Sequence, residues 1–384
     1  MKIIPYGRQS IDQKDIEAVT QSLQSDFLTQ GPLVPLFEKK LCDYTNSKYA
    51  LAVNSGTSAL HAAYFALGLQ NGDEFITTPL TFAATANAGL YLGAKPVFVD
   101  IEKATGNLDP NKIEAAITKK TKLIAVVDYA GHPANLKKIR QIADKYHLKV
   151  VEDACHALGA RYKQTMIGDG KFADVTILSF HPVKHITTGE GGALLTNDSS
   201  VYQKAKLFRS HGITKDKSEL KNATYPDWYY EMQLLGYNYR LTDLQAALGI
   251  SQLKKINKFL RKRHKIAEFY QKNLSELDFL ELPIEKSDIY HAFHLYPVRM
   301  ASHLSQKRDL VFRWLREQQI GVQVHYLPVY LHPYYRQLGY KPGICPMAED
   351  FAQRVISLPM YFDLTKTQQL KIIKLLKKLP KIIN

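Results

Sequence analysis

The chain has 384 residues, 45% of them hydrophobic, with 51 Lys and Arg against 36 Asp and Glu and a formal net charge of +15. That length allows one large core and a smaller second one, and the apolar content excludes a disordered chain. We interpret the basic excess as spread along the chain, without a basic tract interleaved with aromatics, which argues against nucleic-acid binding and favours acidic ligands.

Other bulk features point away from export, metal sites and membranes. Cys42, Cys155 and Cys345 form no C-x-x-C pair, so neither a disulfide framework nor a zinc ribbon is expected. The first residues, MKIIPYGRQSIDQKD, hold no apolar segment of signal-peptide length. The uncharged stretch 75–94 is rich in threonine and alanine and indicates a strand, a turn and a buried helix rather than a membrane span. We therefore expect a cytoplasmic protein without a metal or a membrane partner.

From about residue 49 to 195, β-rich runs alternate with helical patterns. Seven runs have the composition of buried strands, namely YALAV, EFITT, PVFVD, LIAVV, LKVVED, ADVTILSF and GGALLT. Helices are expected between most of them, at about residues 57–68, 81–93, 110–118 and 134–146. Apolar strands covered by helices on both faces predict an α/β fold with an open, mostly parallel sheet. Ligands of such sheets bind at the carboxyl ends of the strands.

The pattern changes after residue 195. A helix is followed by a polar, aromatic loop at 213–236 and a long helical stretch from Thr242 to about residue 272. Further on, HLYPVRM and GVQVHYLPVY look like strands among helices, so we predict a large domain over 1–254 and a smaller α+β domain over 255–384, joined by the long helix. The basic tail KTQQLKIIKLLKKLPKIIN predicts a docked helix with a solvated face, and a membrane-surface helix is the alternative.

Three polar elements stand at strand ends of the predicted sheet. At Gly56 and Thr57 a strand gives way to a helix, whose first N–H groups could bind a phosphate, although an ordinary helix cap is the alternative. Asp153 could pair with a cationic ligand nitrogen or cap the next helix. Lys184 could be a nucleophilic amine or a surface charge. Jointly they supply what pyridoxal 5′-phosphate (PLP) requires: an anion site, an acid for its ring nitrogen and a lysine for its aldehyde.

Five segments carry a family resemblance. NSGTSALHAA, TPLTFAATANA, EDACHALGA, SFHPVKHITTGEGG and GYNYRLTDLQAALG resemble the DegT/DnrJ/EryC1/StrS family of nucleotide-sugar aminotransferases, and the similarity runs over nearly the whole chain. The resemblance implies PLP as cofactor and the PLP-dependent transferase fold type I, similar to aspartate aminotransferase. Within the family, FHPVKHITTGEGG, VQVHYLPVY and YHAFHLYP are most similar to members of the pseudaminic acid pathway.

That resemblance implies a reaction. A UDP-linked 4-keto-6-deoxy-N-acetylhexosamine, UDP-2-acetamido-2,6-dideoxy-β-L-arabino-hexos-4-ulose, would become its 4-amino form, with L-glutamate as donor and 2-oxoglutarate as by-product. Lys184 would bond to the cofactor and then move protons, while Asp153 would keep the ring nitrogen protonated. Phe82 would stack on the ring unless it is an ordinary core aromatic, and Cys155 and His156 would lie near the other face.

The resemblance also implies how the phosphate is held. Gly56, Thr57 and the Ser179 hydroxyl would bind it, together with Asn238 of the neighbouring subunit, so a homodimer with shared active sites is expected. Two charged residues of the same motif are expected to order that loop and begin the long helix rather than touch substrate, Arg240 and Asp243. For the sugar nucleotide the family points to six residues: Tyr6, Thr29, Gln30, Gly31, His325 and Tyr326.

Several alternatives stay open at this point. The tyrosines at 326–335 could stack on uracil or fill a core, and His185 is given no role. The substrate could be another UDP- or TDP-linked 4-keto-6-deoxy sugar. Related 3-dehydratases carry histidine where this chain has Lys184, so the lysine favours amino transfer. A cofactor-binding sugar-nucleotide sensor is the non-enzymatic alternative. The stereochemistry of the sugar and any assembly beyond a dimer are not predicted.

Overall fold

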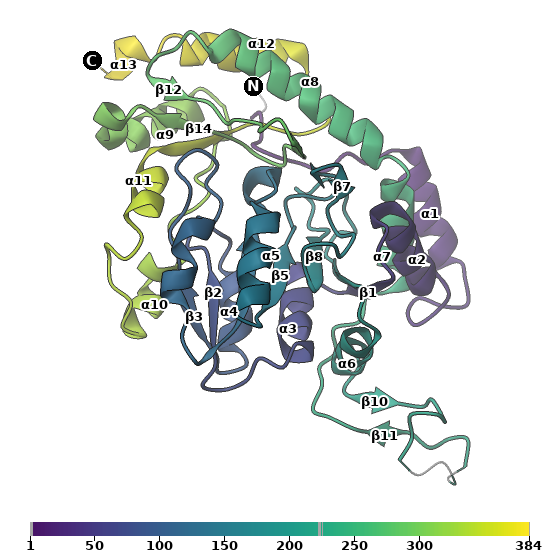
Figure 1. Ribbon diagram of the computed structural model, residues 1–384. Helices are drawn as coiled ribbons and strands as arrows, with labels where there is room; N and C mark the ends of the chain where they lie inside the picture. Colours follow the sequence, from purple (N-terminus) through teal and green to yellow (C-terminus); the bar gives the residue numbers. More distant parts are fainter. Residues whose placement is uncertain (1–2, 222–223, 225, 384) are drawn as a thin grey trace.

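A seven-stranded sheet forms the centre of the computed structural model, which describes residues 3–221, 224 and 226–383 (Figure 1). The strand order is β1-β9-β8-β5-β4-β2-β3, and β9 alone runs antiparallel to its neighbours in this sheet. All seven predicted strands are confirmed: β1 (Tyr49–Val53), β2 (Glu74–Thr77), β3 (Lys95–Phe98), β4 (Thr121–Val127), β5 (Lys149–Asp153), β8 (Val175–Ser179) and β9 (Gly192–Thr196). The mostly parallel α/β fold is therefore confirmed as well.

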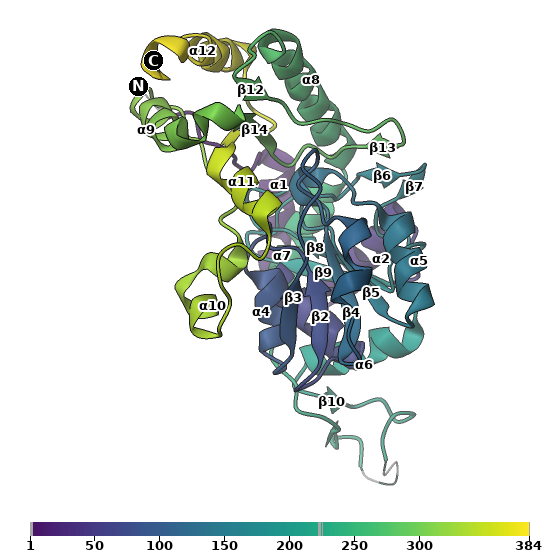
Figure 2. The ribbon, with the colours of Figure 1, turned by 60° about the vertical axis from the view of Figure 1, so that its left-hand side comes forward.

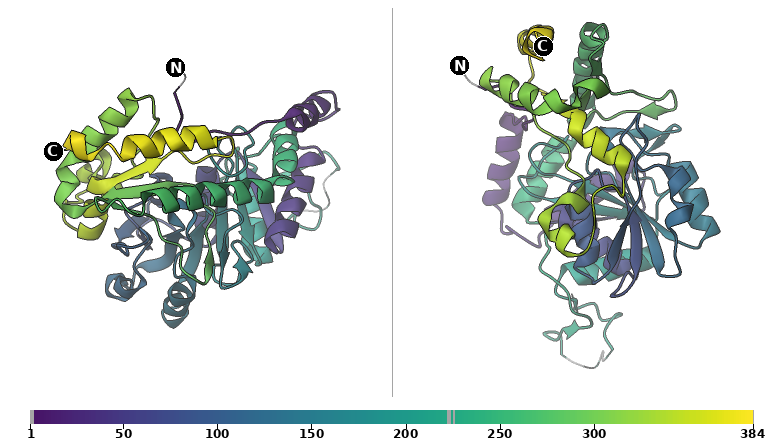
Figure 3. Two further views of the ribbon diagram at one scale, coloured as in Figure 1. Left: turned by 90° about the horizontal axis from the view of Figure 1, so that it is seen from above. Right: turned by 90° about the vertical axis from the view of Figure 1, so that its left-hand side faces the viewer.

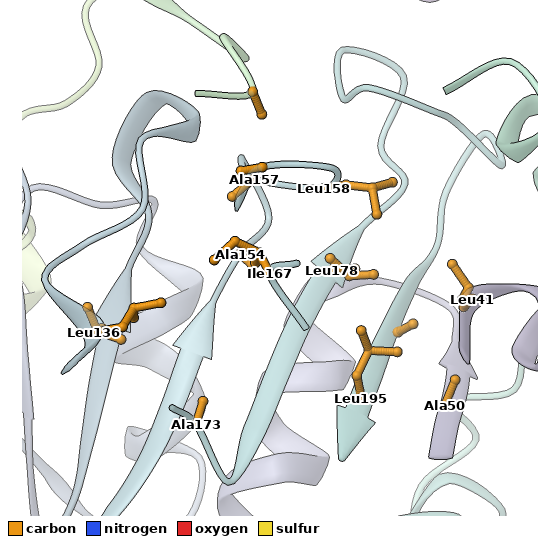
Figure 4. Packing of buried hydrophobic residues seen from close by; sticks show 14 of the residues in the cluster. Leu41, Ala50, Leu136, Ala154, Ala157, Leu158, Ile167, Ala173, Leu178 and Leu195 are labelled. Carbon is orange, nitrogen blue, oxygen red and sulfur yellow. The ribbon is translucent and has the colours of Figure 1, made fainter. Parts of the chain in front are cut away.

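Helices cover both faces of this sheet because successive strand side chains point to opposite faces. In β1, Ala50 and Ala52 pack in the core beneath α2 (Leu33–Thr45), α5 (Leu136–Lys145) and α7 (Asp243–Leu253). Leu51 and Val53 pack in the core beneath α3 (Gly56–Ala66), α4 (Ala84–Leu90) and α6 (Ser199–Arg209). Figure 4 shows the first core, with Leu41 and Leu136 beside strand residues such as Ala50, Leu178 and Leu195.

Two helix predictions need correction. Residues 110–118 form two short 3₁₀ turns, η1 (Pro110–Lys112) and η2 (Glu114–Ala116), because the segment is brief and Ile117 is extended. The long helix from Thr242 is broken into α7 and α8 (Ile256–Leu274). At the break, the Lys255 ammonium lies 2.5 Å from a carboxylate oxygen of the buried Asp15, in α1 (Gln13–Leu23).

The C-terminal region builds a second, antiparallel sheet from β12 (Leu280–Glu281), β14 (Tyr296–Met300) and β15 (Val355–Leu358). Its core includes residues of α8, α9 (Arg308–Glu317) and α12 (Lys366–Leu376), so the predicted docking of the tail helix is confirmed. Ile4 also packs there, and its carbonyl accepts from the N–H of Gly321 at 2.6 Å. The domain boundary at residues 254 and 255 stays a prediction.

One predicted strand is wrong. HLYPVRM contains β14, but GVQVHYLPVY has no strand; Gln323 makes one isolated bridge to Ser357, and a 3₁₀ turn, η5 (Val329–Leu331), follows. Consecutive residues His325 and Tyr326 both line one cavity, which is incompatible with the alternation of a strand, and Pro328 lacks the N–H that a ladder needs.

The remaining elements are short. The loop at 213–236 is confirmed and carries a small hairpin that projects from the body (Figure 2); residues 222, 223 and 225 lie outside the described part. Trp228, Met232 and Leu235 are exposed on it. The other elements are β6 (Arg161–Tyr162), β7 (Thr165–Met166), β10 (Ile213–Thr214), β11 (Glu231–Met232), β13 (Ile289–Tyr290), η3 (Tyr129–Gly131), η4 (Ser302–Lys307), α10 (Pro333–Gln337), α11 (Pro346–Arg354) and α13 (Pro380–Ile383).

The interpretation that the basic excess is spread along the chain is wrong. Residues 254–272, which include most of α8, contain eight Lys or Arg and one acidic residue. Residues 366–384, which begin with α12, contain six Lys and no acidic residue. These two segments carry +13 of the net charge of +15, so the rest of the chain is nearly neutral. The sequence is misleading here because more than ninety residues separate two helices that lie together in the fold.

Candidate active site

A cavity of about 840 Å³ opens at the carboxyl ends of the central strands, where the irregular segment 323–327 faces the sheet. Ten of the predicted site residues line it, drawn from both ends of the chain and from the sheet between them: Tyr6, Gly56, Thr57, Phe82, Asp153, His156, Ser179, Lys184, His325 and Tyr326. The fold thus brings together residues more than three hundred positions apart in the sequence. This position is the one that ligands of open α/β sheets occupy.

The start of α3 forms one wall of the cavity. Ser55 caps the helix, because its hydroxyl accepts from the N–H of Ser58 at 3.0 Å. A Cβ added to Gly56 would lie 3.2 Å from the Ser179 Cβ and 3.3 Å from the Cys155 Sγ, so only glycine leaves the space free. Helix N-terminal N–H groups, the positive end of the helix dipole and the Ser179 hydroxyl therefore face one small opening, which suits a phosphate group.

Asp153 ends β5 and is 5% exposed. One of its carboxylate oxygens accepts from the Thr85 hydroxyl at 2.7 Å, and the other accepts from the N–H of Cys155 at 3.2 Å. The Thr85 oxygen lies 2.8 Å from the Thr81 hydroxyl. Because Thr85 donates its single proton to Asp153, Thr81 must donate to Thr85. This relay fixes the carboxylate and begins beside Phe82, whose ring is 64% exposed and faces the cavity.

Lys184 follows β8 in a tight turn, where its N–H donates to the carbonyl of His181 at 2.9 Å. Burial lowers the pKa of its ammonium, and the neighbouring Cys155 and Asp153 oppose that shift. A lowered pKa increases the fraction of the neutral amine, which is the nucleophilic form. The lysine and the aspartate thus meet in the same cavity.

Buried histidines form the opposite wall. The Nε2 of His156 lies 3.2 Å from the hydroxyl of Tyr326, while its Nδ1 has no hydrogen-bond partner among the described residues. Its ring lies 4.4 Å from that of His294, centroid to centroid. Burial and the charge of Lys184 hold the pKa of both imidazoles well below the ordinary value, so both are neutral. Burial also lowers the pKa of His325 to about 3; its Nδ1 lies 2.9 Å from the Ser357 hydroxyl.

Four predicted site residues do not line this cavity. Asn238 is exposed on the surface, where its carbonyl accepts from the Asn54 side chain at 3.3 Å. Thr29 and Gln30 are exposed, and Gly31 lies beside Asp243. The buried carboxylate of Asp243 accepts from the N–H groups of Gly31 and Leu33, each at 2.8 Å, and Asp243 is the first residue of α7. The expectation that Asp243 begins a helix is therefore confirmed, but its carboxylate holds the segment at Gly31 and Leu33; the ordering of the Asn238 loop by Arg240 and Asp243 stays a prediction.

Sequence reasoning missed two groups of the cavity wall. Thr81 and Thr85 stand four residues apart in TPLTFAATANA, a spacing that places both hydroxyls on one side of a helical turn. His294 lies in YHAFHLYP, a segment that is similar to members of the pseudaminic acid pathway but gives this histidine no predicted role. In both cases the pattern alone does not show that the residue reaches the cavity.

The residues present fit PLP. The opening at Gly56 suits its phosphate, the buried Asp153 suits a protonated ring nitrogen, and Lys184 suits its aldehyde. The unpartnered Nδ1 of His156 leaves a polar atom for a bound group. Fold and site together define a PLP-dependent transferase.

Comparison with known proteins agrees. The model of the DegT/DnrJ/EryC1/StrS aminotransferase family matches residues 9–377, and the chain belongs to this family. A relative from Campylobacter jejuni named UDP-4-amino-4,6-dideoxy-N-acetyl-beta-L-altrosamine transaminase is 42% identical, over 94% of this chain and 93% of the relative. The chain is a PLP-dependent aminotransferase.

Two solved structures have the same fold over almost the whole chain. Helicobacter pylori PseC, an aminotransferase involved in the biosynthesis of pseudoaminic acid, superposes with a TM-score of 0.91 at 37% identity, covering 99% of this chain and 100% of that one. NtdA from Bacillus subtilis, with bound cofactor PMP, superposes with a TM-score of 0.85 at 33% identity, covering 97% and 83%. The predicted fold type I is thereby confirmed. Within the described residues, no helix is long and apolar enough to cross a membrane.

Proposed function

We propose that this aminotransferase converts UDP-2-acetamido-2,6-dideoxy-β-L-arabino-hexos-4-ulose into its 4-amino sugar in the pseudaminic acid pathway, in the cytoplasm. L-Glutamate supplies the amino group and leaves as 2-oxoglutarate. The sugar thus gains an amino group in place of its keto oxygen, and glutamate gains a keto oxygen in place of its amino group. The observation that carries the proposal is the meeting of Lys184 and Asp153 in a cavity that also holds the N-terminus of α3. The names of the 42% identical relative and of the superposed PseC support the choice of substrate.

The cofactor supplies an aldehyde that carries the amino group and a ring that accepts electrons from the reacting carbon. Asp153, held by Thr85, keeps a proton on the ring nitrogen because the buried carboxylate needs a cationic partner. The Gly56 and Thr57 N–H groups and the Ser179 hydroxyl hold the phosphate. Phe82 and His156 both line the cavity, where Phe82 would stack on one face of the ring and His156 would lie near the other.

Lys184 moves the protons. In the glutamate half its neutral Nζ would take the proton from the carbon that bears the amino group, and in the sugar half the same lysine would deliver a proton to C4 of the keto sugar. Burial lowers the pKa of this amine, which keeps the neutral form available for that step. Glutamate and the keto sugar use the same lysine in turn, so the two substrates react alternately.

For the substrate, Tyr6, His325 and Tyr326 lie in the cavity wall and would contact the sugar nucleotide. Thr29, Gln30 and Gly31 would reach it from the loop that Asp243 holds, and Asn238 would reach the phosphate of a second copy. The exposure of Asn238 and its absence from the cavity wall of its own chain support a homodimer with shared sites.

Trapping tests the assignment of the lysine. Borohydride reduction of the enzyme with bound cofactor, followed by peptide mapping, should place the adduct on Lys184 in the peptide that contains HPVKHITT. Lys184→Ala should keep its fold, measured by circular dichroism, and lose turnover. An adduct at another lysine, or sugar transamination by the variant, would contradict the assignment.

A second assay tests the substrate. Release of 2-oxoglutarate is followed with a panel of UDP- and TDP-linked 4-keto sugars, and the proposed sugar should give the highest kcat/KM. Preference for another sugar would keep the chemistry and change the substrate. Loss of the cofactor's absorbance on adding glutamate alone distinguishes the enzyme from a sugar-nucleotide sensor, which would show no such half-reaction.

A further inference from the structure

Two helices lie side by side across the end of the molecule that faces the viewer in the left panel of Figure 3: α8 and α12. The Gln369 side chain of α12 donates to the Ile266 carbonyl of α8 at 3.2 Å, which joins them directly. Their inner faces are buried in the C-terminal core, through residues such as Tyr270 and Ile372. The apolar side of each helix is therefore already used by the fold.

The outer faces of these helices are basic, and we call them the basic face. Ten exposed cations lie on these helices and beside them, because Lys254 precedes α8, Lys377 and Lys378 follow α12, and Lys381 lies in α13. Within α8 the spacings of three, four and seven residues keep the cations on one side of the helix. Within the described residues, none of the ten has an ion pair with an acidic side chain: Lys254, Lys258, Arg261, Lys265, Lys272, Lys366, Lys374, Lys377, Lys378 and Lys381. Glu268 is the one acidic residue among them in sequence.

Such a face is unfavourable for the isolated protein, because like charges one helical turn apart repel each other. The core beneath it is built from the apolar faces of the two helices. Two of the cations lie over aromatic rings, Lys258 over Phe362 at 5.3 Å and Lys366 over Phe269 at 5.6 Å. Two copies of this face do not pair with each other, since surfaces of the same sign repel. The remaining partner is a surface of opposite charge.

We propose that the basic face docks the enzyme on an anionic lipid surface. Nine of the ten cations are lysines, which act as point charges, whereas nucleic-acid sites favour the planar, bidentate guanidinium of arginine. The two helices present their cations along their length, which suits an extended surface of head groups. Leu370, 48% exposed among the α12 lysines, adds one apolar contact. With the apolar faces buried, binding is electrostatic and reversible, without insertion.

This docking is independent of the proposed reaction. No residue of α8 or α12 is among those that line the active-site cavity. Changes on the basic face should therefore leave the activity measured without lipid unaltered, and that activity serves as the check that each variant is folded.

The test is sedimentation of the full-length enzyme with vesicles. Vesicles of phosphatidylcholine with about one third phosphatidylglycerol are compared with vesicles of phosphatidylcholine alone. We expect binding to the anionic vesicles only, and release when salt rises from about 0.1 M to about 1 M, where the screening length falls from about 10 Å to about 3 Å.

The variant Lys374→Gln, Lys377→Gln, Lys378→Gln should lower the bound fraction at least about tenfold. A matched control removes the same number of charges away from the basic face, at the amino end of β4. It replaces three exposed lysines: Lys119→Gln, Lys120→Gln, Lys122→Gln. The control should bind like the wild type.

Three outcomes would overturn the proposal. Equal binding to both vesicle types, or none, would leave the basic face a solvated surface. An equal loss in both triple variants would make net charge, and not this face, the cause. Displacement from the vesicles by a random-sequence DNA duplex at equal phosphate concentration would assign the face to nucleic acid.

Discussion

The Thr85 hydroxyl and the Asp153 carboxylate are 2.7 Å apart, both buried, and they join two segments that line the same cavity. Thr85 belongs to the turn that carries Phe82, and Asp153 ends the neighbouring part of the sheet. The hydrogen bond that Thr85 donates thus fixes the Asp153 carboxylate relative to the ring of Phe82. Four predictions concern this site and its support.

The variant Thr85→Val should weaken the binding of PLP. Valine has nearly the same shape but no donor, and a hydrogen bond to a charged group contributes about 1.5 to 3 kcal/mol, which corresponds to about a tenfold to hundredfold rise in Kd. Titration of apoenzyme with PLP, followed by absorbance, measures it. Thr85→Ser keeps the donor and should bind nearly as the wild type does. Equal affinities for the valine and serine variants would show that the relay does not position Asp153.

The variant Gly56→Ala should fold but hold the cofactor's phosphate poorly. Gly56 is the first residue of α3, with no positive φ, so alanine is compatible with the backbone. Its Cβ would press on Ser179 and Cys155 at 3.2 and 3.3 Å. We expect a thermal midpoint close to that of the wild type and a Kd for PLP raised at least about tenfold, because the Ser179 hydroxyl, one of the proposed phosphate ligands, shifts. An unchanged Kd would place the phosphate elsewhere.

Asp243 should matter for stability more than for chemistry. Asp243→Ala leaves the partly buried N–H groups of Gly31 and Leu33 without the carboxylate that accepts from them, so the free energy of unfolding should fall by about 2 kcal/mol. Asp243→Asn keeps one acceptor and should lose about half as much. Urea unfolding measures both. If residues 29–31 contact the sugar nucleotide, Asp243→Asn also raises its KM while the glutamate half-reaction stays unchanged; an unchanged KM would remove that loop from the site.

The raised pKa of Glu152 leads us to expect that the protein loses stability as the pH rises toward 7. It lies beside Asp128 in the core, and burial raises its pKa to about 7, with the nearby Asp169 and Asp153 adding to the shift. Since the pKa is higher in the folded state than in the unfolded one, the folded state binds more protons between about pH 4.5 and 7, and stability falls as pH rises through that range.

Replacing the Glu152 carboxyl by an amide tests whether its titration causes this loss of stability. Glu152→Gln still accepts from the Thr176 hydroxyl, which lies 2.8 Å from a Glu152 oxygen in the wild type. The variant should lose less stability between pH 5 and 7 than the wild type does, by about 1 to 3 kcal/mol in the free energy of unfolding. Parallel pH curves for the two proteins would show that Glu152 does not titrate in this range.

The central sheet could be predicted from the sequence because its strands are continuous apolar runs separated by helical patterns. The same reasoning failed at GVQVHYLPVY, where the consecutive residues 323–327 line a cavity instead of forming a strand ladder. It also joined α7 and α8, since nothing in the pattern marks Lys255 as the partner of a buried aspartate more than two hundred residues away.

The residues expected to bind the cofactor could be predicted from a few motifs at strand ends. The residues that hold them in place could not be predicted in this way. Thr85 and His294 have no signal of their own because their roles depend on which strand ends meet. The distribution of charge shows the same limit: two basic helices far apart in sequence become one surface only when the C-terminal region folds.

The pairing of Ile4 with Ile320 ties the beginning of the chain to the segment after α9, which is itself joined to the C-terminal sheet where Gln323 pairs with Ser357 of β15, and Tyr6, two residues beyond Ile4, lines the cavity. A displacement of the C-terminal sheet relative to the central one would therefore pull an aromatic ring along the cavity wall. The width of the active-site entrance should therefore depend on where the C-terminal sheet lies, because only two peptide bonds separate Ile4 from Tyr6.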